Sequence, residues 1–479
     1  MIGKPLGHSL SPAIFTFIHQ HLNKQNPSQD FHYLSQELDS SELGAFMQGF
    51  RNDPQFLGLN VTLPHKENIL AYLDEQSHEV QITGAANVIH KSHGKLIGYN
   101  TDIHGILMTL KTHLGPLAGK RAWVLGAGGA ARAVLYALGD LRLEQVELIN
   151  RTPERASRLV EQMRRFFPAT EWRVTAEATS APFALCINAT SVGMGDTSFS
   201  NSLSNSLSNS LFFDRIFSTL AGIPGERGKT SSASAAAFDL IYRPEQTPFL
   251  KAAQKHGLRP IGGLEMLVEQ ALAAWKIWTA GTDPHNANEQ RDPLELDSQK
   301  QLLLHFLRNR PIFLTGFMGA GKSTVGPILA RRLLRNFLDL DRAIESRENK
   351  TIRQLFEEKG EAAFRVLEFE EFQRNFLLPN TVMALGGGAL LNANIRALIQ
   401  KVGTLVYLKT SPKTLAARVR NQHLVRPLLA NLEDRQREAK ILSLLKERES
   451  FYLQAPIQVD TDTVTPEKIV DAILILNRT

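Results

Sequence analysis

The most constraining feature of this sequence is a phosphate-binding loop motif in its last third. The run Gly316-Phe-Met-Gly-Ala-Gly-Lys-Ser323 has the spacing G-x-x-x-x-G-K-[ST]. It follows an apolar strand predicted over Ile312 to Thr315 and precedes a helix predicted over Thr324 to Leu334. In such a loop the backbone amides cradle nucleotide phosphates, the lysine neutralises their charge and the serine hydroxyl ligates magnesium. The motif in this context predicts a P-loop α/β domain with a parallel sheet.

A second nucleotide-binding pattern lies in the first half of the chain. Arg121 to Asn150 is predicted to form a strand, a glycine-rich turn, an Ala-rich helix and a second strand from Val146 to Ile149, which is one βαβ unit. Backbone amides at the start of that helix are expected to meet a pyrophosphate. The turn Gly126-Ala-Gly-Gly-Ala-Ala-Arg132 departs from G-x-G-x-x-G, because alanine stands where the third glycine would be.

The end of the second strand indicates which dinucleotide binds there. An acidic residue at this point would accept a ribose 2′-hydroxyl, but the chain has Asn150-Arg151-Thr152, with Arg155 one turn later. Guanidinium groups bind phosphate through two hydrogen bonds and stack on flat rings. The sequence therefore favours NADP, with its 2′-phosphate, over NAD.

Length and local composition divide the chain. At 479 residues it is predicted to hold roughly three domains of about 150 residues each. Gly281 to Lys300 is polar, contains two prolines and has no sustained periodicity, so it is predicted to be a linker. A Ser-Leu-Ser-Asn repeat at Asn201 to Leu211 and a Ser/Ala-rich stretch at Ser231 to Ala237 cannot bury enough apolar surface to offset chain entropy. Residues 195–235 are therefore predicted to be a low-complexity surface insertion.

Composition excludes several classes of protein. The chain is 43% hydrophobic and 21% charged, and none of its apolar runs reaches the ~20 residues of a membrane span. Cys186 is its single cysteine, which excludes an intrachain disulfide and fits a reducing cytoplasm. The N-terminal residues do not resemble an export signal. A net charge of +6 with interspersed signs suits anionic small molecules, so we expect neither a nucleic acid nor a membrane as partner.

Short motifs before residue 103 place small polar or ionisable groups at turns. They are Gly3-Lys-Pro-Leu-Gly-His-Ser-Leu-Ser-Pro12, Asn60-Val-Thr-Leu-Pro-His-Lys66, Gly84-Ala-Ala-Asn87 and Gly98-Tyr-Asn-Thr-Asp102. Their hydroxyls, amides and one Lys–Asp pair are suited to form a pocket for a polyhydroxylated carboxylate.

Three later motifs complete this pattern: Asn188-Ala-Thr-Ser-Val-Gly-Met194, Asp239-Leu-Ile-Tyr242-Arg-Pro with Thr247, and Gly263-Leu-Glu-Met266 leading to Gln270. Together the motifs resemble shikimate dehydrogenase over residues 1 to about 280. The resemblance implies that Lys66 and Asp102 are the catalytic pair beside the carbon whose hydroxyl becomes a ketone. Only Met1 and Ile2 precede Gly3, so the family's first strand is expected to be nearly absent.

The resemblance also implies two sets of binding residues. The substrate would be held, besides the catalytic pair, by Ser9, Ser11, Thr62, Asn87, Tyr242 and Gln270. The NADP-binding residues would be Gly126, Ala127, Gly128, Gly129, Ala130, Asn150, Arg151, Thr152, Arg155, Thr190, Met194 and Gly263.

The role of Lys66 has two interpretations. Hydride transfer to nicotinamide requires a group that takes the hydroxyl proton as the alkoxide forms, and a neutral lysine can serve. A neighbouring carboxylate instead favours the charged form of a lysine. Lys66 is therefore either the proton acceptor or mainly an electrostatic orienter of the reacting oxygen.

A second series of motifs follows the P-loop. It comprises Phe337-Leu-Asp339-Leu-Asp341, Phe364-Arg365-x-x-Glu368, Gly386-Gly387-Gly388 after a strand, Arg426-Pro-Leu-Leu and Arg448-x-x-x-Tyr452-x-x-Ala455. The series resembles shikimate kinase over residues 310–479. The resemblance implies that shikimate is bound by Asp341, Arg365, Gly386, Gly387, Gly388 and Arg448. It implies an ATP site of Gly319, Ala320, Gly321, Lys322, Ser323, Thr324 and, on a mobile lid, Arg426.

The same resemblance implies that Asp339 and Ser323 hold Mg²⁺ and that Asp341 and Lys322 are catalytic. Such an aspartate can orient the acceptor hydroxyl or take its proton.

The two resemblances predict a bifunctional enzyme that reduces 3-dehydroshikimate with NADPH and phosphorylates the shikimate formed with Mg-ATP. The predicted α/β fold has a substrate lobe over residues 1–115 completed by 250–280, a Rossmann-type NADP domain over 116–249, a linker over 281–300 and a P-loop domain over 301–479 resembling nucleoside-monophosphate kinases. Two alternatives remain open: a dehydrogenase half that prefers quinate or NAD, and a catalytically weak module beside an active kinase.

Overall fold

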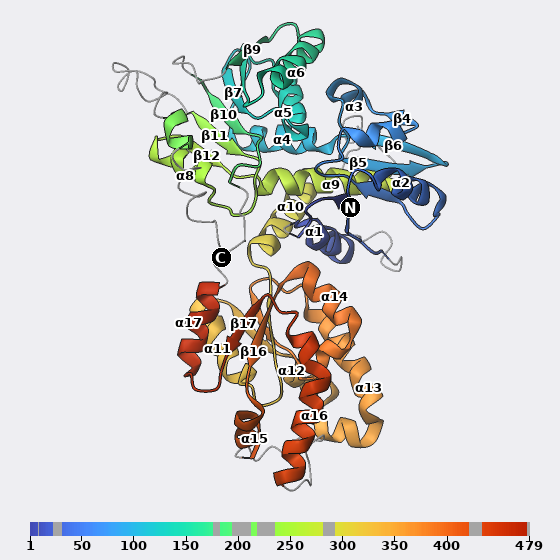
Figure 1. The fold of residues 1–479 in the computed structure, drawn as a ribbon, viewed down its shortest axis with the longest axis vertical. Helices are drawn as coiled ribbons and strands as arrows, with labels where there is room; N and C mark the ends of the chain where they lie inside the picture. Colours follow the sequence, from blue (N-terminus) through green and yellow to red (C-terminus); the bar gives the residue numbers. More distant parts are fainter. Residues whose placement is uncertain are drawn as a thin grey trace. The chain divides into compact units, whose positions relative to one another are not determined.

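The computed structural model describes residues 1–7, 9–22, 31–175, 183–193, 212–217, 235–280, 293–420 and 434–476. Contacts divide the chain into two compact units, which Figure 1 shows as ribbons coloured along the sequence. The first unit comprises Met1–Ser11 and Asp30–Lys300, and the second comprises Pro12–Gln29 and Gln301–Thr479. Residues 12–22, predicted to belong to the substrate lobe, therefore cluster with the C-terminal unit.

A parallel sheet of six strands forms the cofactor domain of the first unit. Its order is β12 (Arg259–Ile261), β11 (Ala236–Asp239), β10 (Leu185–Asn188), β7 (Arg121–Leu125), β8 (Gln145–Ile149) and β9 (Glu171–Thr175). The chain order reverses between β7 and β10, and ligands of such sheets bind beyond the carboxyl ends of the strands at that point. The predicted strands of the βαβ unit are confirmed as β7 and β8.

Helices cover this sheet and connect it to the substrate lobe. They are α4 (Thr101–His113), α5 (Gly129–Asp140), α6 (Pro153–Phe166), α8 (Pro248–Lys255) and α9 (Leu264–Ala280). Helix α9 packs along α4 and reaches the substrate lobe, as Figure 1 shows. There the Trp278 indole Nε1 donates to the Ile89 carbonyl at 3.0 Å.

The substrate lobe contains a mixed four-stranded sheet in the order β3 (Gly58–Asn60), β5 (Val88–Ser92), β6 (Lys95–Tyr99) and β4 (Glu75–Gln76). Around it lie α2 (Leu43–Asn52), the 3₁₀ helix η2 (Asn68–Tyr72) and α3 (His78–Thr83). The nearly absent first strand is confirmed, because β1 (Ile2–Gly3) has two residues and pairs with β2 (Gln36–Glu37). Although short, β1 is anchored, since the Thr62 amide donates to the Ile2 carbonyl at 3.0 Å.

The second unit is built on a five-stranded parallel sheet. Its order is β14 (Asn336–Asp339), β15 (Thr381–Ala384), β13 (Ile312–Thr315), β16 (Thr404–Lys409) and β17 (Ile457–Asp460). Its helices are α11 (Lys322–Leu333), α12 (Leu340–Glu348), α13 (Ile352–Asn375), η3 (Ala389–Leu391), α14 (Ala393–Val402), α15 (Pro412–Arg420), α16 (Asp434–Tyr452) and α17 (Pro466–Leu476). The strand predicted before the P-loop is confirmed as β13, and the following helix begins two residues earlier than predicted.

The predicted linker is shorter than expected. Residues 293–300 belong to helix α10 (Pro293–Arg308), which starts with a proline at a position where helices tolerate one. Lys300 is buried and pairs with Glu269 of α9 at 3.2 Å. Further along, Phe306 stacks on Phe17 of α1 (Ser11–Phe17) with ring centroids 4.6 Å apart. The polar composition of 281–300 concealed this helix, whose apolar positions come mainly after residue 302. Residues 281–292 lie outside the described part of the chain.

The predicted low-complexity insertion also contains packed structure. Residues 212–217 form a helical turn, and Phe213 and Phe217 are fully buried. Both rings contact Phe249 of α8, at centroid separations of 5.2 and 5.3 Å. The Ser-Leu-Ser-Asn repeat at 201–211 and the stretch 218–234 lie outside the described residues.

This packing predicts the effects of two neighbouring substitutions. Phe217→Ala should cost about 3–5 kcal/mol of stability because it removes a buried aromatic ring and leaves a cavity. Phe212→Ala, whose ring is 50% exposed, should cost less than about 1 kcal/mol. Urea unfolding followed by tryptophan fluorescence measures both, since all four tryptophans lie in the first unit: Trp123, Trp172, Trp275 and Trp278. Equal losses would contradict the packed position of Phe217.

Candidate functional sites

An ion pair occupies the centre of the first unit's site. The Lys66 ammonium donates to Asp102 Oδ2 at 2.5 Å, and the two side chains are only 15% and 8% exposed. Lys66 follows strand β3, whereas Asp102 lies in the first turn of α4. The structure thus brings together the two residues that the sequence predicted as the catalytic pair.

A buried amide fixes the position of that aspartate. Asn87 Nδ2 donates to Asp102 Oδ1 at 2.8 Å and to Thr101 Oγ1 at 3.0 Å, while Asn87 Oδ1 accepts from the Thr101 amide at 2.8 Å. Gln270 Oε1, on α9, accepts weaker bonds of 3.4 Å from Asn87 and Thr101. Thr101 had no predicted role, although it stands inside a quoted motif.

A second cluster of polar side chains contains the predicted serines. The Ser11 amide donates to Ser9 Oγ at 3.2 Å, and Ser9 and Ser11 bond to the phenols of Tyr242 and Tyr33 respectively. Tyr33 also donates to Asn60 Oδ1 at 2.6 Å. Burial raises the pKa of both tyrosines above the usual value, so the phenols stay neutral. Sequence reasoning missed Tyr33, because no motif surrounds it.

Thr62 occupies a different setting from the other predicted substrate residues. Its methyl group packs on Gly3, where an added Cβ would lie 2.3 Å from Thr62 Cγ2. The described contacts of Thr62 connect it to β1 rather than to the cluster around Asp102 or the cluster around Ser9. Thr62 is partly exposed beside the turn that carries Lys66.

The glycine-rich turn has the local geometry of a dinucleotide site. Gly126 has φ +102°, and a Cβ there would approach Thr190 Cγ2 to 2.8 Å, so glycine is required. Gly128 precedes α5 and has open space where a side chain would be, which permits close approach of a ligand. The stem of Lys66 lies 3.5 Å from a Cβ built at Gly129, so the Lys66–Asp102 pair adjoins the turn. Ala127 is buried and Ala130 is in the first turn of α5.

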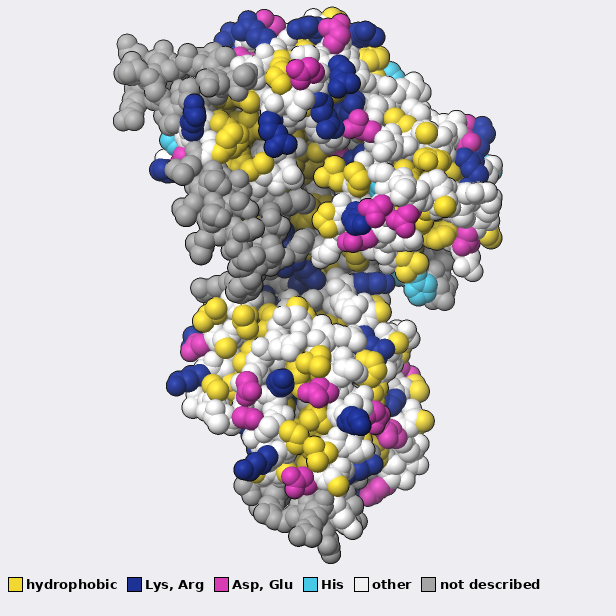
Figure 2. Space-filling model, in the orientation of Figure 1, with side chains coloured by type: hydrophobic (Ala, Val, Ile, Leu, Met, Phe, Trp, Pro, Cys, Tyr) yellow, Lys and Arg dark blue, Asp and Glu magenta, His cyan; other side chains and the backbone are white. Residues whose placement is uncertain are grey.

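The predicted 2′-phosphate residues follow β8. The Asn150 amide group donates to the Thr152 carbonyl at 2.8 Å, Arg151 is exposed, and Thr152 is the N-cap of α6. Arg155, in the first turn of α6, donates to Glu67 Oε1 at 3.2 Å. Lys and Arg side chains gather on this face around α5 and α6 (Figure 2).

A buried carboxylate holds the loops at the carboxyl ends of β10 and β11. Asp239 accepts from Asn188 Nδ2 at 3.0 Å, from the Ile241 amide at 3.0 Å and from Thr247 Oγ1 at 2.6 Å. Asn188 in turn accepts from Thr190 Oγ1 at 2.7 Å. Gly263 packs on the Leu240 carbonyl, where a Cβ would come within 2.4 Å. Burial raises the pKa of Asp239 to about 7. Met194 lies outside the described residues.

The P-loop of the second unit has the geometry required for phosphates. Gly319 and Gly321 have φ values of +83° and +98°, a region that favours glycine. The Lys322 ammonium donates to the Gly316 carbonyl at 2.7 Å, and Ser323 Oγ donates to Asp339 Oδ2 at 2.7 Å. Hydroxyl and carboxylate oxygens are ligands that Mg²⁺ accepts, so this pair fits the predicted metal site. Ala320 is buried in the loop, and Thr324 is in the first turn of α11.

The predicted acceptor site surrounds the turn after β15. A Cβ at Gly386 would lie 2.9 Å from Asp341 Oδ1, and one at Gly388 would lie 2.3 Å from the Arg365 guanidinium. The Gly387 carbonyl accepts from Arg448 Nη1 at 3.3 Å. The structure therefore brings Asp341, Arg365, the three glycines and Arg448 together. Arg426 lies outside the described residues.

Two groups in this site were not assigned a role from sequence. Glu368 is buried and accepts from Arg365 Nη1 at 2.7 Å, and Tyr452 donates to the Gly387 carbonyl. Burial raises the pKa of Glu368 to about 7, although the Arg365 charge opposes the shift. Both residues stood in quoted motifs, so their positions were marked but their roles were not.

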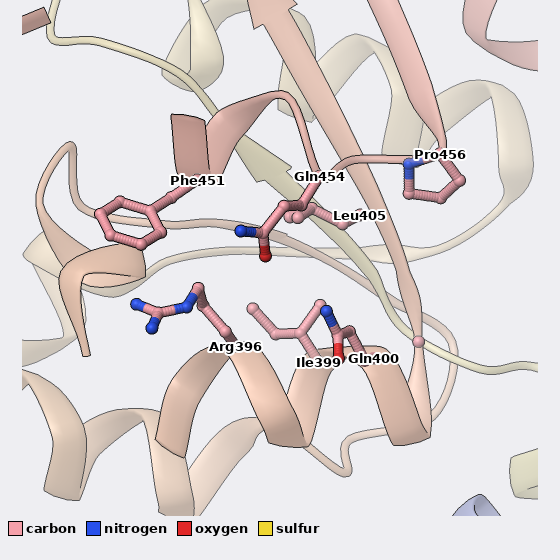
Figure 3. A pocket seen from close by; sticks show the side chains of 8 residues that line it. Arg396, Ile399, Gln400, Leu405, Phe451, Gln454 and Pro456 are labelled. Atoms are coloured by element: carbon pink, nitrogen blue, oxygen red, sulfur yellow. The ribbon is translucent and has the colours of Figure 1, made fainter. Parts of the chain in front are cut away.

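A shallow pocket of about 150 Å³ lies elsewhere in the second unit, between α14, β16 and the end of α16 (Figure 3). It is lined by Arg396, Ile399, Gln400, Gly403, Leu405, Phe451, Gln454 and Pro456. The Arg396 guanidinium lies 4.3 Å from the Phe451 ring centroid and donates to the Leu391 carbonyl at 3.0 Å. None of the predicted catalytic residues lines this pocket, so it is not the kinase-like site.

The described residues provide neither a metal-binding cluster nor a membrane-spanning helix. They contain no cluster of three or more His, Cys, Asp and Glu side chains arranged to hold a metal. None of the helices in the described part of the chain is both long and apolar enough to cross a membrane.

Family models match both parts of the chain. The family model described as shikimate dehydrogenase substrate binding domain matches residues 1–89, that of shikimate/quinate 5-dehydrogenase matches 109–182, and that of shikimate kinase matches 318–476. The NADP⁺ shikimate dehydrogenase of Caldicellulosiruptor bescii is 36% identical over 281 residues, which cover 58% of this chain and 88% of that protein. That of Salinibacter ruber is 36% identical over 294 residues, covering 58% and 90%.

A solved structure also matches the first part of the chain. The crystal structure of shikimate 5-dehydrogenase from Thermus thermophilus, in complex with NADP(H) and shikimate, is 34% identical in sequence. The match covers 63% of this chain and 97% of that chain, with a TM-score of 0.47.

The buried carboxylate of Asp239 predicts a pH dependence of stability. Its folded-state pKa of about 7 lies above the ordinary 3.8, so the folded protein binds the proton more tightly than the unfolded chain. This contribution is fully present below about pH 4 and is lost as the pH rises to about 7, by up to about 4 kcal/mol. Urea unfolding of the wild type and of Asp239→Asn at several pH values, followed by tryptophan fluorescence, measures the difference. Parallel pH profiles for the two proteins would contradict the prediction.

Proposed function

This chain belongs to the shikimate dehydrogenase family and carries a shikimate kinase domain over residues 318–476, and we propose that it catalyses two consecutive reactions of the shikimate pathway. The first unit reduces 3-dehydroshikimate to shikimate with NADPH, and the second phosphorylates shikimate with Mg-ATP. The main support for the first activity is the Lys66–Asp102 pair, whose Nζ and Oδ2 atoms are 2.5 Å apart and which lies against the glycine-rich turn. The main support for the second activity is the P-loop with its Ser323–Asp339 pair.

In the dehydrogenase reaction, Lys66 acts on the oxygen that changes between hydroxyl and carbonyl. Its ammonium is held by Asp102, whose second oxygen is held by Asn87, so the pair has a fixed direction. In the reductive direction Lys66 donates a proton to the forming hydroxyl, or stabilises its negative charge until the proton arrives. The fixed geometry of the pair supports a role for Asp102 as the group that orients the lysine and bonds the neighbouring substrate hydroxyl.

The second cluster of polar side chains, which contains the two serines, is suited to the substrate's carboxylate and remaining hydroxyls. Ser9, Ser11 and Tyr242 are hydroxyl donors, and burial raises the pKa of the Tyr242 phenol and keeps it neutral. NADPH supplies the hydride when it is bound. Gly128, which precedes α5, leaves open space for its pyrophosphate, and Arg151 with Arg155 binds the 2′-phosphate.

In the kinase reaction, Arg448 and Arg365 bind the carboxylate of shikimate. Arg448 is 3% exposed, and its contact with the Gly387 carbonyl leaves other N–H groups of the guanidinium for the ligand. Asp341, beside Gly386, orients the acceptor hydroxyl and accepts its proton. Lys322 neutralises the transferred phosphoryl group. Ser323 and Asp339 would hold Mg²⁺, which would supply further positive charge to the phosphates.

Of the alternatives that the sequence left open, one stays a candidate and one is disfavoured. Quinate stays a second candidate substrate of the first unit, because the matching family model covers both shikimate and quinate dehydrogenases. A catalytically weak dehydrogenase is disfavoured by the intact network around Lys66. We further propose small-molecule partners only and a cytoplasmic location, which fits a single buried cysteine.

Reciprocal lysine substitutions test the two activities in one polypeptide. Lys66→Ala should lower the rate of NADPH oxidation with 3-dehydroshikimate by about 10²–10⁴-fold, because it removes the acid–base group, and should leave ADP release with shikimate unchanged. Lys322→Ala should abolish ADP release and spare NADPH oxidation. Unchanged tryptophan fluorescence of Lys66→Ala shows that the first unit is still folded, since all four tryptophans lie there. If Lys66→Ala kept near-normal NADPH oxidation, its catalytic assignment would be wrong.

The carboxylate role of Arg448 predicts a selective loss of affinity. Arg448→Ala should weaken shikimate binding at least tenfold, since truncating one member of a buried charge pair costs roughly 2–5 kcal/mol. ATP affinity should stay close to normal. Calorimetry measures both, and Lys446→Ala, an exposed position on the same helix, is the matched control. Tight shikimate binding by the Arg448 variant would refute the assignment.

A further inference from the structure

The residue after the catalytic lysine connects two lobes of the first unit. Glu67 Oε2 accepts from Arg132 Nη2 of α5 at 3.0 Å, and Glu67 Oε1 accepts from Arg155 Nη2 of α6 at 3.2 Å. Glu67 belongs to the substrate lobe, whereas both arginines belong to the cofactor domain. One carboxylate therefore uses its two oxygens to bind two guanidinium groups.

The two arginines differ in how firmly they are held. Arg132 is 19% exposed and also donates to the Thr83 carbonyl at 2.7 Å and to Gln162 Oε1 at 3.2 Å. Gln162 bonds the neighbouring Ile82 carbonyl at 2.5 Å, so α3 stays attached to α5 and α6 without Glu67. Arg155 is 52% exposed, and its hydrogen bond goes to Glu67. Arg155 can therefore leave Glu67 at smaller cost than Arg132.

Arg155 is also one of the two arginines proposed above for the 2′-phosphate of NADP. A carboxylate and a phosphate are both anionic acceptors for the same guanidinium, and a phosphate carries more charge. The Glu67 carboxylate offsets the charge of Arg155 and repels a second anion beside it, so Arg155 binds a phosphate best after it has left Glu67. Glu67 and the 2′-phosphate thus compete for Arg155.

We propose that Glu67 sets the enzyme's affinity for 2′-phosphorylated cofactors by occupying Arg155 in the cofactor-free protein. When a 2′-phosphate binds, Arg155 exchanges Glu67 for the phosphate, and Glu67 remains bonded to Arg132. The inference rests on the proposed role of Arg155 in the dehydrogenase. It makes Glu67 a specificity-determining residue for the cofactor, although Glu67 itself is not predicted to contact NADP.

Replacing the carboxylate with an amide tests this exchange. In the full-length chain, Glu67→Gln should bind adenosine 2′,5′-bisphosphate about two- to fivefold more tightly than the wild type, the factor that an exposed ion pair supplies. Binding of 5′-AMP, which lacks the 2′-phosphate, should not change. The gain should shrink at high ionic strength, because salt screens the competing pair. Calorimetric titration measures these affinities, and unchanged tryptophan fluorescence shows that the first unit of the variant, which contains all four tryptophans, is folded.

Control variants separate the possible failures. Glu154→Gln removes a charge from the same turn of α6 without removing the partner of Arg155, and should give a smaller gain. An equal gain in Glu154→Gln, or no gain in Glu67→Gln, would overturn the exchange. Arg155→Ala should weaken binding of the bisphosphate but not of AMP, and Glu67→Gln added to it should give no further gain. If Arg155→Ala left the bisphosphate affinity unchanged, the proposed cofactor role of Arg155 would fail first, and the exchange with it.

Discussion

The buried side chain of Asn87 is the interaction on which the dehydrogenase site depends. Its amide bonds Asp102, Thr101 and Gln270, three groups that come from α4 and from α9, far apart in the sequence. Its backbone carbonyl accepts from Val61, at the end of the strand that precedes the lysine turn. A buried amide is costly unless its hydrogen bonds are made, so these segments are held in one arrangement. The direction of the Lys66–Asp102 pair follows from that arrangement.

Much of the fold and of both sites was predictable because glycines and charged residues stand at fixed positions relative to strands. The βαβ unit, the strand before the P-loop and the fusion of two enzyme domains are confirmed. Lys66 with Asp102, and Arg448 with the Gly387 carbonyl, lie together as the motifs predicted. In each case local sequence fixes the end of an element, and the parallel sheet brings those ends to one edge.

The features that sequence reasoning missed depend on contacts between distant segments. Tyr33 reaches Ser11 and Asn60 from a stretch without motif or periodicity. Phe213 and Phe217 interrupt a polar low-complexity region, and contacts with distant residues such as Phe249 of α8 explain their burial. Helix α10 was hidden because its first half is polar, while its burial depends on partners near residues 17 and 269. Composition over a window cannot report such long-range packing.

The two proposed sites recognise the same acid by different physics. The serine and tyrosine group of the first unit offers neutral hydroxyl donors, and burial raises the pKa of its phenols and keeps them uncharged. The second site instead buries Arg448 and holds Arg365 against Glu368, whose pKa burial raises to about 7. When Glu368 binds a proton, Arg365 keeps Glu361 as a carboxylate partner at 2.9 Å. The buried Arg448, whose hydrogen bond goes to the neutral Gly387 carbonyl, then loses the opposing charge of Glu368, which is costly. A bound carboxylate removes that cost, so this site gains more from the substrate's negative charge than the first site does.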